Sequence, residues 1–405
     1  MKLFIVDSDT RIDYDEFLEN ILSSECYVPN FQCSELFPYF ANLIKAFITN
    51  SPVTLIDSDF SQDEIGKLGI NDVNVPVKIS IPSVKGFDEL LDLLHTSSSE
   101  IEIYTSGTTG QPKKIQHTYQ SLSRAVRRGV KYENDIWGYA YNPTHMAGLQ
   151  VFLQILENRN TLINIFNKGR EEIFGKIKDF GITHISATPT FYRMLLPADT
   201  KFDSVQRVTF GGEKSNEKLY NGVQTLFPNA KITNIYASTE AGTLFASHGS
   251  DFVIPAEMRD KFRVENRELL IHRSLLGRSP QLNIIDEFYH SGDLIEWVDE
   301  SNGVFRFVSR KNELINVGGY KVNPQEVEDT IRRIDGVKDV HVFGRANSVL
   351  GNILCADVVK DNSTDVSEMA IRQFLSTELQ DFKIPRRIKF RENLEVTRTG
   401  KMKRL

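Results

Sequence analysis

A chain of 405 residues with 40% hydrophobic, 25% charged and 10% aromatic residues has globular composition and is long enough for two or three domains. This composition excludes a largely disordered, collagen-like or coiled-coil chain, and a net charge of −6 provides no overall electrostatic case for binding nucleic acid. Three cysteines without a CxxC pair suit a reducing compartment. Because no apolar stretch approaches the roughly 20 residues that span a bilayer, we expect a cytoplasmic protein without a membrane span.

The first 100 residues form an indistinct pattern of short strands and helices, interrupted by prolines. A loop at 96–99 ends this section, and beyond it the pattern becomes regular. A strand is expected over 101–103, followed by a loop rich in Gly and Thr, and then a helix over 117–130.

Strands and helices alternate in the middle of the chain. The helix expected over 170–180 has Gly181 at its C-terminal end, where glycine commonly stops a helix. Such alternation predicts an α/β fold with parallel sheets. Strands are expected at four runs rich in β-branched residues, 161–166, 182–188, 206–210 and 231–236.

The pattern changes again over 251–310, where short strands and several glycines replace the helices. A boundary near 309–312 predicts a large domain of residues 1–310 and a small α+β domain of residues 311–405.

The small domain is expected to begin with a helix. Asn323 can cap it, Pro324 suits its first turn, and Glu326 completes a capping-box spacing. Its apolar face is expected to hold Val327, Ile331 and Ile334. The remaining expected elements are strands at 338–343, 353–359 and 387–390 and a helix near 365–380.

The most informative motif is the loop between the first regular strand and helix. Its glycines let backbone N–H groups approach a polyphosphate, its hydroxyls add hydrogen-bond donors, and its lysine adds charge. It is not a Walker A loop, because no glycine directly precedes the lysine. A flexible linker is the alternative, which the structural context makes less favourable. The loop reads Thr105-Ser106-Gly107-Thr108-Thr109-Gly110-Gln111-Pro112-Lys113.

This loop resembles the phosphate loop of the adenylate-forming superfamily, which includes acyl-CoA synthetases, aryl-CoA ligases, luciferases and peptide-synthetase adenylation domains. The resemblance covers about residue 101 to the end, and the leading section is shorter than the family usually has. It implies a large N-terminal domain of parallel α/β sheets with a small β subdomain, followed by a small mobile C-terminal domain.

A second match is Tyr236-Ala237-Ser238-Thr239-Glu240, where Ala237 replaces the family's usual glycine. By resemblance, Thr239 contacts the phosphate of AMP and Glu240 holds Mg²⁺, for which a carboxylate is a suitable ligand. Alone, this pentapeptide would more often be an ordinary strand end.

Two further matches imply nucleotide recognition. Gly211-Gly212-Glu213 corresponds to the family's turn on the adenine side, although a Gly-Gly pair alone is nearly uninformative. Asp293, in Ser291-Gly292-Asp293, and the following Arg310 correspond to the residues that reach the ribose. A turn residue and a surface arginine are the alternatives, and the order and spacing of the motifs disfavour both.

The small domain carries three more matches. Asn312 lies at the family's hinge, and Gly318-Gly319-Tyr320-Lys321 resembles the loop that enters the active site for thioester formation. Lys401, in Thr397-Arg398-Thr399-Gly400-Lys401, matches the catalytic lysine of adenylation, while Glu395 replaces the family's proline. From Arg386 onward the chain has eight basic and two acidic residues, so a solvated or nucleic-acid-binding tail is the alternative.

The element Pro143-Thr144-His145-Met146-Ala147-Gly148 matches the family's Pro-x-x-His-x-x-Gly beside the acyl pocket, with His145 as a wall or gate. Peptide-synthetase domains usually carry an Asp near this element to hold an amine, and none lies between Tyr139 and Gln150. A simple aryl or aliphatic acid is therefore favoured over an amino acid.

The resemblance implies an AMP-forming acid–thiol ligase that uses ATP and Mg²⁺ and transfers the acyl group to coenzyme A. The phosphopantetheine arm of an acyl carrier protein presents the same thiol and is the alternative acceptor. Two rival interpretations are a non-catalytic nucleotide-binding relic, which intact Lys113, Glu240 and Lys401 oppose, and a nucleic-acid-binding protein, which the acidic remainder opposes.

Overall fold

The computed structural model describes residues 2–105, 113–213, 215–317, 319–347, 351–361 and 366–394. Most of the phosphate loop (106–112), Gly318 and the segment containing Lys401 lie outside these ranges. Among the helices that the structure describes, none is long and apolar enough to cross a membrane.

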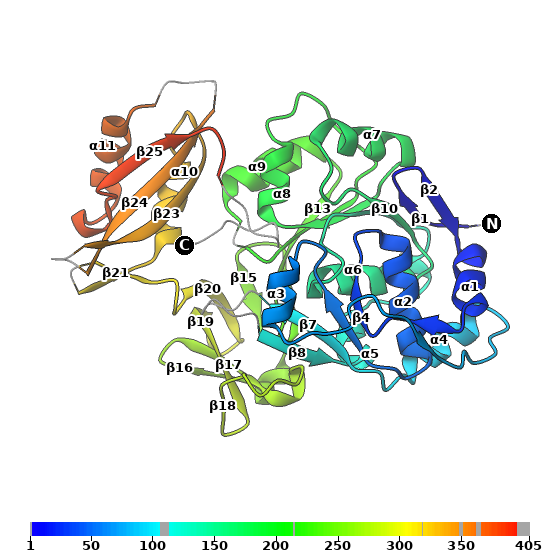
Figure 1. The fold of residues 1–405 in the computed structure, drawn as a ribbon. Coiled ribbons are helices and arrows are strands. Elements are labelled where there is room, and N and C mark those ends of the chain that lie inside the picture. The colour runs from blue at the N-terminus through cyan, green and yellow to red at the C-terminus, as the bar shows by residue number, and fades with distance from the viewer. Residues whose placement is uncertain are drawn as a thin grey trace.

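The largest sheet has eight strands in the order β14-β13-β12-β11-β9-β10-β1-β2. Its inner strands are parallel, while β2 and β14 are antiparallel edges. The carboxyl ends of parallel strands are where open α/β sheets bind ligands. Its strands are β1 (Leu3–Asp7), β2 (Thr10–Asp13), β9 (Ile136–Tyr139), β10 (Thr161–Asn164), β11 (His184–Ala187), β12 (Arg207–Gly211), β13 (Lys231–Ser238) and β14 (Gly242–Ser247). Helices α6 (Met146–Glu157), α7 (Arg170–Phe180), α8 (Pro189–Leu195) and α9 (Glu217–Leu226) connect them (Figure 1).

The leading section builds a second sheet in the order β4-β5-β7-β8, with β8 antiparallel. Helix α2 packs between this section and α6, and the rings of Phe40 and Phe152 stack with centroids 3.6 Å apart. The elements are β3 (Cys26–Tyr27), β4 (Asn30–Gln32), β5 (Val53–Ile56), β6 (Val77–Lys78), β7 (Ile101–Thr105), β8 (Lys113–His117), α1 (Tyr14–Ser23), α2 (Leu36–Ile48), α3 (Gln62–Lys67), α4 (Phe87–His95) and α5 (Tyr119–Ser123).

The helix expected over 117–130 is wrong in its extent. β8 continues to His117, and α5 covers only Tyr119–Ser123, with Thr118 as its N-cap. The backbone then leaves helical geometry, and Gly129 has a φ of +125° that a helix cannot accommodate. The helix over 170–180 is confirmed, with Gly181 in the left-handed conformation after it.

A smaller antiparallel sheet follows over 251–310, as the pattern predicts, although β19 is longer than expected. Its strands are β15 (Asp251–Val253), β16 (Phe262–Glu265), β17 (Glu268–His272), β18 (Ile284–Ile285), β19 (Phe288–Asp299) and β20 (Val304–Arg310).

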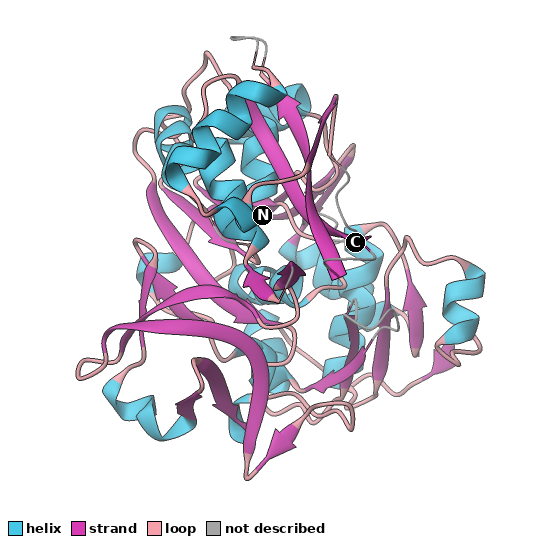
Figure 2. Ribbon diagram, turned by 90° about the vertical axis from the view of Figure 1, so that its left-hand side faces the viewer, coloured by secondary structure: helices cyan, strands magenta, loops and turns pink. Residues whose placement is uncertain are grey.

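Beyond the turn at 311–313, a separate hydrophobic cluster contains only residues from Ile315 onward. Figures 1 and 2 show this part as a sheet covered by helices beside the large sheet assembly. Its elements are β21 (Ile315–Val317), β22 (Tyr320–Val322), β23 (Val337–Asn347), β24 (Gly351–Lys360), β25 (Arg387–Arg391), α10 (Pro324–Arg332) and α11 (Glu368–Glu378).

Asn323 caps α10 and Pro324 occupies its first turn, as expected. The capping box is wrong, because the Glu326 carboxylate accepts a hydrogen bond from Lys383 Nζ at 2.7 Å. Val327 and Ile331 are buried on the expected apolar face, and Ile334 is partly buried beside them.

Candidate active site

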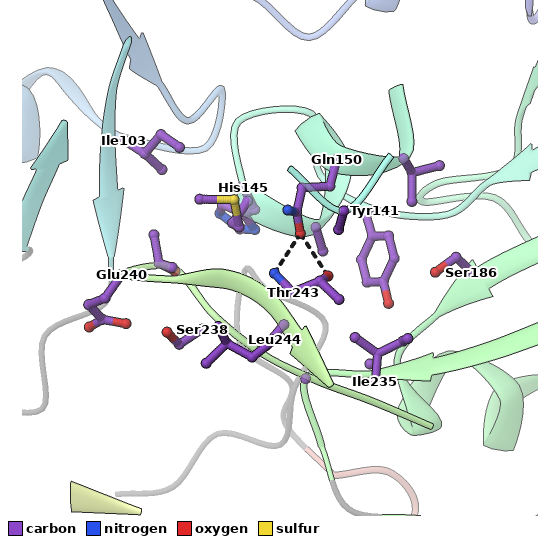
Figure 3. A pocket seen from close by; sticks show the side chains of 18 of the residues that line it. Ile103, Tyr141, His145, Gln150, Ser186, Ile235, Ser238, Glu240, Thr243 and Leu244 are labelled. Carbon is purple, nitrogen blue, oxygen red and sulfur yellow. Dashed lines mark hydrogen bonds between the residues drawn. The ribbon is translucent and has the colours of Figure 1, made fainter. Parts of the chain in front are cut away.

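A cavity of about 1560 Å³ lies at the carboxyl ends of β11, β12 and β13 and extends along the face of the large sheet. Strand β8, helix α6, the β19–β20 pair and the turn after β20 complete its walls. Figure 3 shows side chains from α6, β11, β13 and β14 around it, with Glu240 on one side of the view and Ser186 on the other. The expected site residues that line it are Lys113, His145, Gly211, Gly212, Ala237, Ser238, Thr239, Glu240, Asp293, Arg310 and Asn312.

The turn after β13 presents Thr239 and Glu240 to the cavity, and three successive carbonyls of this turn are held from different parts of the chain. The Thr239 carbonyl accepts from His117 Nε2 at 2.8 Å. The Glu240 carbonyl accepts from the Gly277 backbone N–H at 2.7 Å, and the Ala241 carbonyl accepts from Arg124. These contacts fix the turn while leaving the Glu240 side chain directed into the cavity.

His117 can make this contact because it is a neutral, buried imidazole. Burial lowers the pKa of His117 to about 4. A neutral ring that donates through Nε2 has an unprotonated Nδ1, which lies 3.0 Å from the Ser121 hydroxyl. Gly277 packs directly against the ring, since an added Cβ would lie 2.6 Å from His117 Cε1.

The Glu240 carboxylate faces the cavity, where a ligand could reach it. Its carboxylate is partly exposed to the cavity and accepts a long hydrogen bond, 3.5 Å, from the Tyr289 hydroxyl. In the part of the chain that the structure describes, no three His, Cys, Asp or Glu side chains form a metal site by themselves. One carboxylate suits Mg²⁺, whose remaining ligands are usually phosphate oxygens and water.

Asp293 is a buried carboxylate between β19 and β20. One oxygen accepts from Arg310 Nε at 2.9 Å, and the other accepts from the Tyr236 hydroxyl. The negative charge of Asp293 raises the pKa of Arg310. Burial, followed by that same charge, raises the pKa of Tyr236. The three side chains therefore form a charged cluster at the wall of the cavity.

Tyr236 and Glu213 differ from the other expected nucleotide residues in their placement. The Tyr236 ring packs in an aromatic cluster with Phe245, Phe252 and Phe305, and only its neighbours Ile235 and Ala237 line the cavity. The Glu213 carboxylate accepts from the backbone N–H and the hydroxyl of Thr190 at the start of α8. Neither Tyr236 nor Glu213 lines the cavity, although the Tyr236 hydroxyl reaches the cavity-lining Asp293.

His145 precedes α6 and lies 3.3 Å from the Asp57 carboxylate at the end of β5. Burial opposes ionisation of Asp57, but hydrogen bonds from His145 and from the Asp59 backbone outweigh it and lower the pKa of Asp57. Gly148 permits close packing, since an added Cβ would lie 2.2 Å from the Asn142 carbonyl oxygen. Gly148 therefore shapes the helix behind the cavity.

The acceptor loop lies away from this cavity. Tyr320 is exposed and stacks on Phe382 with ring centroids 4.4 Å apart, and the described residues Gly319, Tyr320 and Lys321 are absent from the cavity lining. The expected roles of Ser106, Gly107, Thr108, Thr109, Gly110, Gly318 and Lys401 fall on residues outside the described ranges, as does the side chain of Thr105.

Sequence reasoning missed His117, Arg124, Gly277 and Asp57. Each acts on the site through a contact between distant segments, for example His117 with Thr239, 122 residues away. A single sequence carries no local signal for such pairs.

The fold is that of an α/β protein, and its cavity gathers residues that the sequence motifs associate with binding a nucleotide. Family models match twice: AMP-binding enzyme over residues 98–264, and AMP-binding enzyme C-terminal domain over residues 326–401. The chain therefore belongs to the AMP-binding enzyme family, among the adenylate-forming acyl- and aryl-CoA ligases.

Relatives and solved structures agree with this membership. The 2-succinylbenzoate–CoA ligase of Staphylococcus epidermidis is 21% identical over 455 residues, covering 100% of this chain and 94% of that protein. Bacitracin synthase 3 of Bacillus licheniformis is 26% identical over 363 residues, covering 77% of this chain but 6% of that protein. The crystal structure of ATP-bound MatB from Rhodopseudomonas palustris shares the fold, with a TM-score of 0.77 at 18% identity over 99% of this chain and 94% of that chain.

Proposed function

We propose that the protein is an AMP-forming carboxylic acid–thiol ligase that makes an acyl-CoA. The carboxylate oxygen of the acid attacks the α-phosphorus of ATP, pyrophosphate leaves, and an acyl-adenylate forms. The thiol then attacks the acyl carbon, so that a thioester forms and AMP leaves. The observation that carries the proposal is the convergence of Lys113, Glu240 and Asp293 on one cavity.

The first step needs charge neutralisation and positioning. Lys113 at the start of β8 and Lys401 would neutralise charge on the phosphates, and Thr239 would donate to the α-phosphate. Glu240 would hold Mg²⁺, which neutralises phosphate charge when bound. The carbonyl contacts of the turn keep Thr239 and Glu240 in place without reorganisation during the reaction.

Asp293 and Arg310 would bind the ribose, and the glycine turn at Gly211 and Gly212 would leave room for the adenine. Both oxygens of Asp293 already accept hydrogen bonds, so ribose hydroxyls would share or replace the contact from Tyr236. His145, paired with Asp57, would wall the acid side of the cavity.

Residues 1–310 would form the adenylation domain and residues 311–405 a mobile domain that turns about Asn312. The separate hydrophobic cluster beyond Ile315 supports this division. Rotation would bring Gly318, Gly319, Tyr320 and Lys321 to the cavity for the thiol step. Coenzyme A is the favoured acceptor, because relatives along the whole chain are named CoA ligases. A carrier-protein phosphopantetheine arm is the alternative, and we place the reaction in the cytoplasm.

The test is ATP-dependent pyrophosphate release with a panel of aryl and aliphatic acids, repeated with coenzyme A and with a phosphopantetheinylated carrier protein. The ligase proposal expects acid-dependent pyrophosphate and then a thioester. Nucleotide binding without pyrophosphate release from any acid would indicate the non-catalytic relic.

A further inference from the structure

The floor of the cavity carries a row of hydroxyl groups. Ser186 on β11 pairs in register with Thr209 on β12, which pairs in register with Thr233 on β13. All three residues line the cavity. We name them the hydroxyl row.

The side chains of the row share one face of the sheet, because the three residues are in register and side chains alternate along each strand. The preceding residues Ile185, Val208 and Ile232 are buried in a hydrophobic cluster, and Ile185 and Val208 also contribute to the cavity lining. Neighbouring strands are about 4.8 Å apart, so three in-register residues span about 10 Å of the floor.

The row has hydrogen-bonding capacity left for a ligand. Within the described residues, the Thr209 hydroxyl has no hydrogen-bond partner, and Thr233 has only a 3.4 Å contact with His248 Nδ1. Ser186 and Tyr141 both line this part of the cavity, and Figure 3 shows their side chains on the same side of it.

The row lies within reach of an acid bound for activation. Gly211, at the nucleotide end of β12, is two residues from Thr209, or about 7 Å along the strand. The Tyr141 side chain occupies the space beside Gly211, since a Cβ added there would lie 2.8 Å from the Tyr141 hydroxyl oxygen. Gly211 and Thr209 line the same cavity, so an acid extending from the nucleotide end can reach the row.

The facing walls carry several apolar side chains beside Gln150, whose amide oxygen already accepts hydrogen bonds from the backbone and the hydroxyl of Thr243. Met146, Ala147 and Val151 line the cavity from α6, and Leu244 and Ala246 line it from β14. Such a slot accepts a carbon skeleton but gives one side of it hydroxyl partners. A plain hydrocarbon body would cover the row without replacing its hydrogen bonds to water, which is costly.

We infer that the acid substrate carries a second oxygen-bearing group, an oxo, hydroxyl or carboxylate group, remote from its reacting carboxylate, and that the hydroxyl row binds it. This inference rests on the proposed ligase function and states its substrate class. A site built to hydrogen-bond an oxygen rejects the methylene analogue strongly.

The experiment compares matched acids: 5-oxohexanoate and glutarate against hexanoate, and 4-acetylbenzoate and terephthalate against 4-ethylbenzoate. We expect kcat/KM for pyrophosphate release to favour an oxygen-bearing member at least about tenfold in one series. Acid binding with AMP present, measured calorimetrically, should show the same order. Comparing the oxo acids, 5-oxohexanoate and 4-acetylbenzoate, with the dicarboxylates, glutarate and terephthalate, shows which oxygen group the row prefers.

Thr209→Val removes the hydroxyl at nearly constant volume and should reduce that preference about tenfold, while Thr209→Ser should retain most of it. Thr225→Val, on an exposed position of α9, is the matched control and should keep the wild-type preference. Equal rates within each pair, or a preference that Thr209→Val leaves intact, would overturn the inference while leaving the ligase proposal standing. If the protein binds the oxygen-bearing acids selectively but releases no pyrophosphate with any acid, the hydroxyl row is supported as an acid-binding site and the ligase proposal is rejected.

Discussion

At the scale of single residues, the motifs predicted which side chains meet at the cavity, but not what holds them. Glu240, Asp293 and Arg310 come from three segments and line one cavity, as the family resemblance implies. His117 was unpredictable, because its importance depends on the carbonyl of Thr239. Tyr236 illustrates a different limit, since it stands in its motif while its ring packs in a hydrophobic cluster and does not line the cavity.

Glu240→Gln keeps the size of the side chain but removes the charge that binds Mg²⁺. Pyrophosphate release should fall by about two orders of magnitude or more, while circular dichroism and thermal unfolding stay near wild type. The metal dependence should also change, with a higher Mg²⁺ concentration needed for half-maximal rate. Near-normal turnover would remove Glu240 from the metal site.

Asp293→Asn should raise the KM for ATP about tenfold or more, because the neutral amide pairs poorly with Arg310 and with ribose hydroxyls. The KM for the acid should change much less. Separate titrations of both substrates measure this difference, and an equal change in both constants would contradict the ribose assignment.

His117 should make stability depend on pH. Its pKa is about 4 in the folded protein against 6.5 for an unperturbed histidine, so the unfolded chain binds the extra proton between these values. The stability it contributes is complete above pH 6.5 and falls as pH decreases toward 4, by about 2 kcal/mol at pH 5.

His117→Gln cannot titrate, so its destabilisation relative to wild type should be largest at pH 7 and should shrink by a similar amount at pH 5. Urea unfolding of both proteins across this range measures the difference. A constant or growing difference on acidification would show that His117 is not held neutral.

At the scale of elements, segments with a local signal were predictable, and a helix without a polar face was not. Helix α7 was predicted from its place between strands and from Gly181, and the four central strands from their β-branched runs. Helix α2 is buried nearly all round, so it lacks the polar face that marks a surface helix. Helix α5 ends at Ser123, and the side chain of the next residue, Arg124, donates to the Leu275 and Ala241 carbonyls, a long-range contact with no local sequence signal.

Gly277 joins the loop after β17 to the turn after β13 and to the end of β8. Its N–H donates to the Glu240 carbonyl, and its Cα lies against the His117 ring. Gly277→Ala would place Cβ 2.7 Å from the Gln116 carbonyl oxygen, so the loop must shift away from the turn. We expect a loss of pyrophosphate release of about tenfold or more and a lower melting temperature.

Gly249→Ala is the matched control, because an added Cβ there meets no described atom within 4 Å. Its activity and melting temperature should stay near wild type. If both glycine variants behave alike, the packing of the loop against His117 does not position the metal-binding turn.

At the scale of the whole molecule, the change in pattern near 309–312 coincides with the turn between β20 and β21. How the two parts contact each other was not predictable, because it depends on surface side chains far apart in sequence. Lys218 on α9 donates to the Val337 carbonyl at 3.0 Å and lies 3.5 Å from the Arg332 carbonyl oxygen, beside the end of α10. This arrangement leaves the described residues of the acceptor loop outside the cavity, so it is not the arrangement expected for the thiol step.

Lys218→Met should therefore weaken an arrangement that excludes the acceptor loop. Losing one such contact, worth about 0.5–1.5 kcal/mol, should lower the ratio of the adenylation rate to the thioester rate about two- to tenfold. Single-turnover measurements of each half-reaction are needed, with pre-formed acyl-adenylate for the second, because steady-state rates mix chemistry with domain motion.

Lys401→Ala should abolish the first step and spare the second. Lys231→Met, an exposed substitution on β13, controls for the lost charge and should leave the ratio unchanged. If Lys218→Met slows both half-reactions equally, the contact stabilises the fold without selecting a domain arrangement.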